Sequence, residues 1–145
     1  MLTYADVCCR FVVVEALRTH SGQPKALDLW RQRSRFREYW DKMVFVTAEL
    51  HDDEATACAN PAEANGKHCV RERSQRDQIM TGLRAAGAQP HDIVMVSDLD
   101  ELLPRRAAAA LQHCRTPLPL TFASELFYYS FRWRITHASG QVLPL

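Results

Sequence analysis

Several features that mark common protein classes are missing from this 145-residue sequence. It has no apolar run near the ~20 residues that a membrane-spanning helix requires, so we predict no membrane segment in this chain. Asp6 precedes the first apolar stretch and no basic segment comes before it, so the start does not resemble a signal peptide. The formal net charge is only +1, and the basic residues between Arg10 and Arg37 are typical of a solvated helix face. Nucleic acid is therefore not an expected partner.

The cysteines lack the spacing of a metal site. No two of them form a C-x-x-C pair, and none shows paired Cys/His spacing, so zinc is not expected. Cys58 and Cys69 flank a polar loop and would pair in an oxidising compartment, whereas free thiols are the simpler interpretation. The sequence leaves the compartment open. The five cysteines are Cys8, Cys9, Cys58, Cys69 and Cys114.

Short apolar runs alternate along the chain with amphipathic or alanine-rich segments. Short β-branched runs bounded by loop residues are typical of buried strands, and apolar residues at helical spacing predict helices. This alternation predicts an α/β layered sheet in one domain, 1–145, with a polar insertion at about 51–68. Strands are predicted over 10–16, 43–47, 93–96 and, from an alternation with period two, 127–135; helices over Leu27–Trp40, Arg71–Ala86 (capped by Gly87) and Arg105–Cys114; and a loop over Thr19–Lys25.

An acidic turn follows the predicted strand at 93–96, in the segment VMVSDLDE of Val94–Glu101. Ligands bind at the carboxyl ends of strands in open α/β sheets, and Asp98 and Asp100 would lie there. Two carboxylates two residues apart can turn toward one hard cation such as Mg²⁺ or Mn²⁺. Such a cation bridges to a diphosphate and neutralises the charge of the leaving group. The pattern predicts a metal–diphosphate site.

Three other interpretations compete for this turn. Asp98 or Asp100 would cap the helix that begins near Pro104 in a purely structural turn. A calcium EF-hand loop is a poor match, because its glycine and its later glutamate are absent. A haloacid-dehalogenase-like phosphohydrolase would use Asp98 as its nucleophile. That family usually continues with Gly-Thr, where this sequence has Glu101-Leu102, so we rank it second.

Four ordered blocks of residues resemble the β-1,4-mannosyl-glycoprotein 4-β-N-acetylglucosaminyltransferase family, glycosyltransferase family 17. Together they are far more specific than the two aspartates alone. The blocks are FVVVEA at 11–16 with SGQPK at 21–25, RERSQRD at 71–77 followed by Gly82-Leu83, DIVMVSDLDEL at 92–102, and FYYSFRW at 127–133.

The resemblance implies a GT-A-like (Rossmann-like) nucleotide-sugar-binding sheet with flanking helices, incomplete at both ends. It implies UDP-GlcNAc as the donor and the β-linked mannose of an N-glycan core on a glycoprotein as the acceptor. The transfer would form a β-1,4 linkage with inversion, in the Golgi lumen or at its membrane.

The same resemblance implies roles for individual residues. Asp98 and Asp100 would hold Mn²⁺ (or Mg²⁺) with UDP, and Glu101 would support their turn or face the sugar. Glu15 would contact the nucleotide, or else form a solvent-facing strand end. Arg73 and Arg76 would reach the diphosphate, although ion pairs with nearby acids are slightly favoured. On their strand, Tyr129 and Trp133 are expected in the core, and His20 is given no role.

The sequence also departs from the family. Leu103 stands before Pro104 where the family usually runs E-I-P, so the turn is one residue longer. No residue is assigned as the general base that an inverting transferase needs. The family has an upstream strand and a long C-terminal part in which that base is expected. A catalytically inactive, truncated homologue is therefore a further hypothesis.

Overall fold

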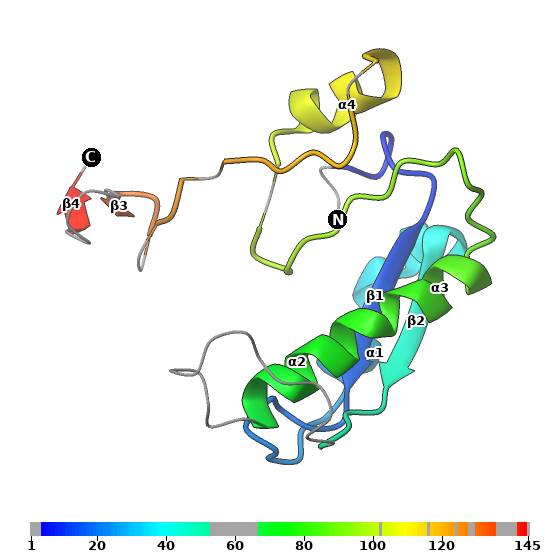
Figure 1. Ribbon diagram of the computed structural model, residues 1–145, viewed down its shortest axis with the longest axis vertical. Helices are drawn as coiled ribbons and strands as arrows, with labels where there is room; N and C mark the ends of the chain where they lie inside the picture. Colours follow the sequence, from blue (N-terminus) through cyan, green and yellow to red (C-terminus); the bar gives the residue numbers. More distant parts are fainter. Residues whose placement is uncertain are drawn as a thin grey trace. The chain divides into compact units, whose positions relative to one another are not determined.

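The structure is a computed structural model that describes residues 4–52, 67–101, 103–115, 117–123, 125–127, 130–135 and 142–144 (Figure 1). The chain divides into two compact units, Met1–Asp92 and Ile93–Leu145. Most of the predicted polar insertion, residues 53–66, lies outside the described residues.

A parallel pair of strands forms the centre of the first unit. Strands β1 (Phe11–Ala16) and β2 (Met43–Ala48) pair in register from Phe11 opposite Met43 to Ala16 opposite Ala48. Parallel neighbours require a crossover connection, and here helix α1 (Asp28–Arg31) and the 3-10 helix η2 (Arg33–Lys42) provide it. Both predicted strands are confirmed.

Two helices pack on one face of this sheet. They are α2 (Lys67–Asp77) and α3 (Ile79–Ala85), and Figure 1 shows them in front of β1 and β2. The buried Gly82 faces Val12 of β1 and Val46 of β2, where an added Cβ would overlap the valine side chains. Because alternate strand residues share a face, Val12, Val14, Val44 and Val46 form the surface under α3.

Helix α2 begins at Lys67, four residues before the predicted start at Arg71, and the predicted single helix is divided in two at Gln78. The predicted C-terminal end of this helical segment, now the end of α3, is confirmed. Gly87 has a positive φ of 74°, its N–H donates to the Arg84 carbonyl, and the Ala88 N–H donates to the Leu83 carbonyl. These two bonds form a Schellman cap, which a glycine in the left-handed region favours.

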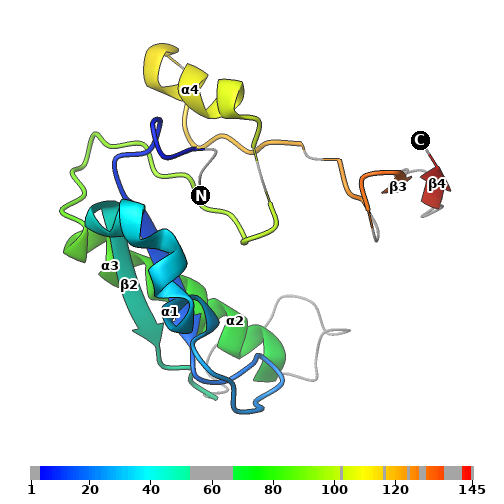
Figure 2. The ribbon, with the colours of Figure 1, turned by 180° about the vertical axis from the view of Figure 1, so that it is seen from behind.

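The other face of the sheet carries α1 and η2, which lie in front in the reverse view (Figure 2). Trp30 and Trp40 both contact Phe45 of β2, with ring centroids 5.4 and 5.2 Å from it. A straight α-helix would separate residues ten apart by about 15 Å, yet the two tryptophan rings lie 5.7 Å apart. The predicted continuous helix over Leu27–Trp40 is therefore wrong, because the segment kinks, with non-helical dihedral angles at Phe36, and brings both rings onto Phe45.

The second unit contains α4 (Arg105–His113), as predicted, and the antiparallel pair β3 (Trp133–Ile135) and β4 (Val142–Pro144). The predicted strand over 93–96 is wrong. These residues have no regular secondary structure, and Ile93, Val94 and Val96 are exposed. A β-prone run becomes a strand only when its backbone groups bond to a neighbour, and the pairings of the described residues include none for it.

The predicted strand over 127–135 is also shorter than expected. Its period-two pattern breaks at a turn over 130–132. Among the described residues of this range, Trp133–Ile135 is the strand, and Phe127 forms an isolated bridge to Arg134. Phe131 is 82% exposed and Trp133 42% exposed, so the core position predicted for Trp133 is wrong. Tyr129 lies outside the described residues. The fold is thus mixed α/β with a small parallel sheet and helices, and its GT-A assignment stays a prediction.

Candidate functional site

The acidic turn in the second unit is closed by two reciprocal hydrogen bonds. The Asp98 N–H donates to the Glu101 carboxylate over 3.0 Å, and the Glu101 N–H donates to the Asp98 carbonyl over 3.2 Å. This arrangement resembles a capping box, in which a side chain three residues on satisfies the first backbone donor. Glu101 therefore supports the turn, as one of its two predicted roles required. Asp98 and Asp100 are exposed beside it.

The turn borders a pocket of about 300 Å³ within the second unit, lined mostly by apolar residues. Glu101 and Ser97 are the polar side chains nearest the turn in its lining. Exposed apolar side chains beside fixed polar groups are a common composition for ligand pockets. The apolar lining comes from the segment 93–96, Leu103, Leu111 of α4, Leu118, Leu120 and Phe122.

The donor groups of this turn fit a hard divalent cation that is shared with phosphate. Among the described residues no three His, Cys, Asp or Glu side chains come together as a complete metal cage. Mg²⁺ and similar ions do not need one, because they bind through one or two carboxylates plus substrate phosphates. Since Glu101 accepts the Asp98 N–H, the candidate ligands are the exposed carboxylates of Asp98 and Asp100.

Glu15 has a structural contact in the first unit. Its two carboxylate oxygens accept the backbone N–H groups of Leu29 and Trp30 at 3.1 and 3.2 Å. Those N–H groups belong to the first turn of α1, where backbone donors lack helical partners and a negative charge is favoured. The half-buried carboxylate thus fixes α1 to the end of β1, and the solvent-facing alternative for Glu15 is wrong.

The two arginines predicted near the diphosphate differ in their contacts. Arg76 pairs with Glu72 one helical turn away, at 3.1 and 3.2 Å, which confirms the ion-pair interpretation for this residue. Arg73 is exposed on α2, and within the described part of the chain it forms no ion pair. Arg73 is the one of the two with a guanidinium available to a ligand.

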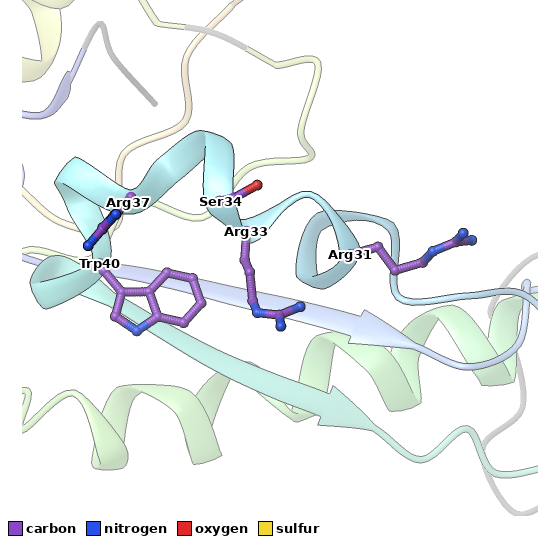
Figure 3. A pocket seen from close by; sticks show the side chains of 5 residues that line it. All are labelled: Arg31, Arg33, Ser34, Arg37 and Trp40. Carbon is purple, nitrogen blue, oxygen red and sulfur yellow. The ribbon is translucent and has the colours of Figure 1, made fainter.

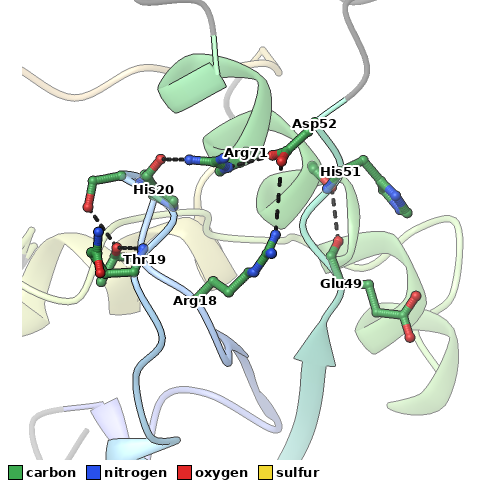
Figure 4. A network of polar contacts seen from close by, with 10 residues as sticks. Arg18, Thr19, His20, Glu49, His51, Asp52 and Arg71 are labelled. Carbon is green, nitrogen blue, oxygen red and sulfur yellow. Dashed lines mark hydrogen bonds and ion pairs between the residues drawn. The ribbon is translucent and has the colours of Figure 1, made fainter.

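Sequence reasoning missed a polar cluster at the carboxyl ends of β1 and β2, centred on Arg71 (Figure 4). Arg71 is only 8% exposed; its Nε donates to Asp52 Oδ1 at 2.6 Å and its Nη1 to the His20 carbonyl at 3.0 Å. The hydrogen bond to Asp52 raises the pKa of Arg71 above its usual value. Arg18 approaches the other Asp52 oxygen at 4.0 Å. The cluster ties the loop after β1 to the segment after β2.

Helix α2 holds this edge through two more side chains. The Gln75 amide oxygen Oε1 accepts from the His20 ring Nε2 over 2.9 Å, and the Gln75 Nε2 donates to the Val14 carbonyl at 3.0 Å. Ser74 donates to the Glu49 carbonyl and accepts the His51 N–H. His20, to which the sequence assigns no role, is therefore part of the framework of the edge where parallel sheets bind ligands.

One sequence signal could have revealed the cluster. Gly22 has a positive φ of 91°, and a Cβ placed there would lie 2.7 Å from Arg71 Nη1. The loop glycine thus permits a close approach by a buried charge, and a buried charge requires a partner. That partner, Asp52, falls inside the predicted insertion, where the sequence gives no reason to single it out.

The cysteines divide into two groups. Cys8, Cys9 and Cys114 are free thiols, whereas Cys69 at the start of α2 is disulfide-bonded to a partner outside the described residues. The free-thiol interpretation is wrong for Cys69.

Within the described ranges, no helix has the length and apolarity to cross a membrane.

A family model described as glycosyltransferase family 17 matches residues 2–142, nearly the whole chain. No curated protein and no solved structure shows significant similarity to it.

Proposed function

Because the chain belongs to glycosyltransferase family 17, we propose that it transfers N-acetylglucosamine from UDP-GlcNAc to the β-linked mannose of an N-glycan core, forming a β-1,4 linkage. The observation that carries this proposal is the extent of the family match, 2–142 of 145 residues. Membership makes the chain a glycosyltransferase, which has a sugar donor and a sugar acceptor as partners.

The proposed reaction is a single displacement. A mannose hydroxyl oxygen attacks the anomeric carbon of the donor from the face opposite the diphosphate, and the bond from that carbon to the diphosphate oxygen breaks. The electron pair leaves with UDP, and the hydroxyl proton passes to a general base. Attack from the opposite face inverts the anomeric centre. No residue of this chain is assigned as the base.

Asp98 and Asp100 are the proposed ligands of Mn²⁺ (or Mg²⁺). The bound cation would stabilise the negative charge that collects on the leaving diphosphate. Support comes from the chemistry of the turn, because both carboxylates are exposed and the backbone between them is fixed by Glu101. A preorganised pair of ligands avoids the cost of ordering the turn when the metal and the nucleotide bind.

The remaining site residues are proposed with roles that fit their contacts. Arg73, which has no carboxylate partner among the described residues, is the proposed diphosphate contact. Arg76 is held by Glu72, so its interaction with the nucleotide would have to displace that ion pair. Glu15 is proposed to act on the nucleotide indirectly, by holding α1 beside the carboxyl end of β1.

The proposed location is the Golgi lumen. The disulfide at Cys69 supports an oxidising compartment, because thiols of cytosolic proteins are kept reduced.

A transfer assay tests the proposal against the two alternatives. The protein is incubated with UDP-GlcNAc, Mn²⁺ and a free N-glycan with an exposed core mannose, and mass spectrometry and NMR identify the product. We expect one added N-acetylhexosamine in a β-1,4 linkage. Phosphate release from an aryl phosphate, abolished by Asp98→Asn, would instead establish the phosphohydrolase. UDP binding with neither reaction would establish an inactive homologue.

A further inference from the structure

A second candidate ligand site lies on the crossover segment between β1 and β2, which is distant in sequence from the acidic turn. A groove of about 400 Å³ is lined by Arg31, Arg33, Ser34, Arg37 and Trp40, all from α1 and η2 (Figure 3). None of these residues belongs to the proposed donor or metal site. Any ligand of the groove would therefore bind outside the proposed donor and metal site.

The three arginines of this groove have no carboxylate partner among the residues that the structure describes. In the described part of the chain, arginine–carboxylate ion pairs include those of Arg18 and Arg71 with Asp52, of Arg76 with Glu72, and of Arg134 with Glu125. Arg31, Arg33 and Arg37 are in none of them. Three like charges on one short segment repel each other, and an anionic ligand removes that repulsion.

Aromatic packing fixes the orientation of part of the groove. The Arg33 guanidinium lies 5.0 Å from the centre of the Trp30 ring and donates through Nη1 to the Trp30 carbonyl at 3.1 Å. Trp40, 38% exposed, is held against Trp30 and Phe45. A guanidinium and an indole that are already ordered lose little entropy when a ligand binds.

The distribution of charge along the groove indicates an extended ligand. Figure 3 shows the three arginines spread along the helical segment, with no common meeting point. Arg31 and Arg37 are six positions apart, and the break between α1 and η2 and the kink at Phe36 both lie between them. A single phosphate or sulfate contacts only one end of that span. Several oxyanions joined by rings would reach all three arginines and cover the exposed face of Trp40.

We infer that this groove binds an acidic oligosaccharide, with its carboxylate or sulfate groups on the arginines and a pyranose ring against Trp40. The choice of a saccharide over other polyanions rests on the proposed glycosyltransferase function. The groove would hold a charged part of a glycan apart from the reacting mannose. Planar guanidinium groups form paired hydrogen bonds with such oxyanions.

Binding of a heparin-derived hexasaccharide to the full chain, followed by Trp fluorescence and calorimetry, tests this inference. We expect Arg33→Gln with Arg37→Gln to weaken binding by about tenfold, and Arg37→Gln alone by a few-fold. Trp40→Phe should weaken it with the charge unchanged. Arg35→Gln is the matched control: it removes the same charge from η2, but Arg35 bonds to Gln32 and does not line the groove, so affinity should stay within about twofold.

Three results would overturn the inference. One is equal binding of neutral chitohexaose; another is equal affinity for inorganic sulfate. The third is binding to phosphatidylserine vesicles without binding to the hexasaccharide, which would assign the groove to a lipid surface. Melting curves of each variant show whether it is folded. Because GlcNAc transfer is measured separately, any of these three results obtained with transfer intact would contradict this site and leave the proposed function standing.

Discussion

Replacing Asp98 and Asp100 together by asparagine is expected to lower GlcNAc transfer by at least about 100-fold in kcat. Asparagine keeps the size of each side chain and removes the two negative charges that would bind the cation. The leaving diphosphate would then lack its neutralising charge in the transition state. The measurement is UDP release from UDP-GlcNAc at saturating acceptor, with Mn²⁺ varied.

The matched control is Asp41→Asn, the same chemical change at an exposed position of η2 in the other unit. It should leave turnover unchanged. Turnover of the double variant within about threefold of the parent would contradict the metal assignment, since removing one transition-state contact commonly costs far more. The Glu101→Gln variant extends the comparison. The amide oxygen of the introduced glutamine would still accept the Asp98 N–H, so a small loss would indicate that Glu101 acts through turn geometry.

Gly82→Ala should destabilise the protein by about 1–3 kcal/mol, although alanine is the better helix former. A Cβ at residue 82 would overlap Val12 Cγ1 and lie 3.0 Å from Val46 Cγ2. Both neighbours are β-branched side chains on paired strands, which cannot easily rotate away. Helix α3 must then move off the sheet. Urea unfolding monitored by circular dichroism measures the change in the free energy of unfolding.

The control for helix propensity is Thr81→Ala, at an exposed position of the same helix. At that position the higher helix propensity of alanine should raise the free energy of unfolding slightly or leave it unchanged. An increase in stability for Gly82→Ala, as for an ordinary glycine in a helix, would contradict the close packing of α3 on β1 and β2.

Local sequence patterns were enough to predict β1, β2 and α4. Each carries its signal in consecutive residues, the valine runs for the strands and the alanines for the helix. Gly87 likewise marks the end of α3, because a left-handed residue is needed for the two capping hydrogen bonds.

Features that depend on distant residues were not predictable. The kink at Phe36 follows from the packing of two tryptophans on one phenylalanine of β2. The helical spacing of apolar residues in the sequence does not indicate that packing. The run at 93–96 has β-branched residues, yet strand formation depends on a neighbour and not on the run itself. For the same reason, Phe131 follows the alternating pattern and is still exposed.

The candidate site shows the same division. The two aspartates were singled out from their position after an apolar run, and the supporting role of Glu101 was one of two roles that the family resemblance implied. Glu15 was identified, but its bond to the first turn of α1 could not be foreseen across 14 residues. Arg71 and Asp52 are 19 residues apart, with Asp52 inside the predicted polar insertion and Arg71 beyond it. Only the fold brings them together.

The most direct test of the metal–nucleotide site is the melting temperature of the chain with UDP and Mn²⁺. A ligand present at about 100 times its dissociation constant stabilises the folded state by about 2.7 kcal/mol, or about 5–10 °C for a chain of this size. We expect this shift with UDP and Mn²⁺ together and a much smaller one with UDP in the presence of a chelator. The Asp98→Asn/Asp100→Asn variant should lose it. The same shift in that variant would contradict the assignment of these two aspartates as the metal ligands.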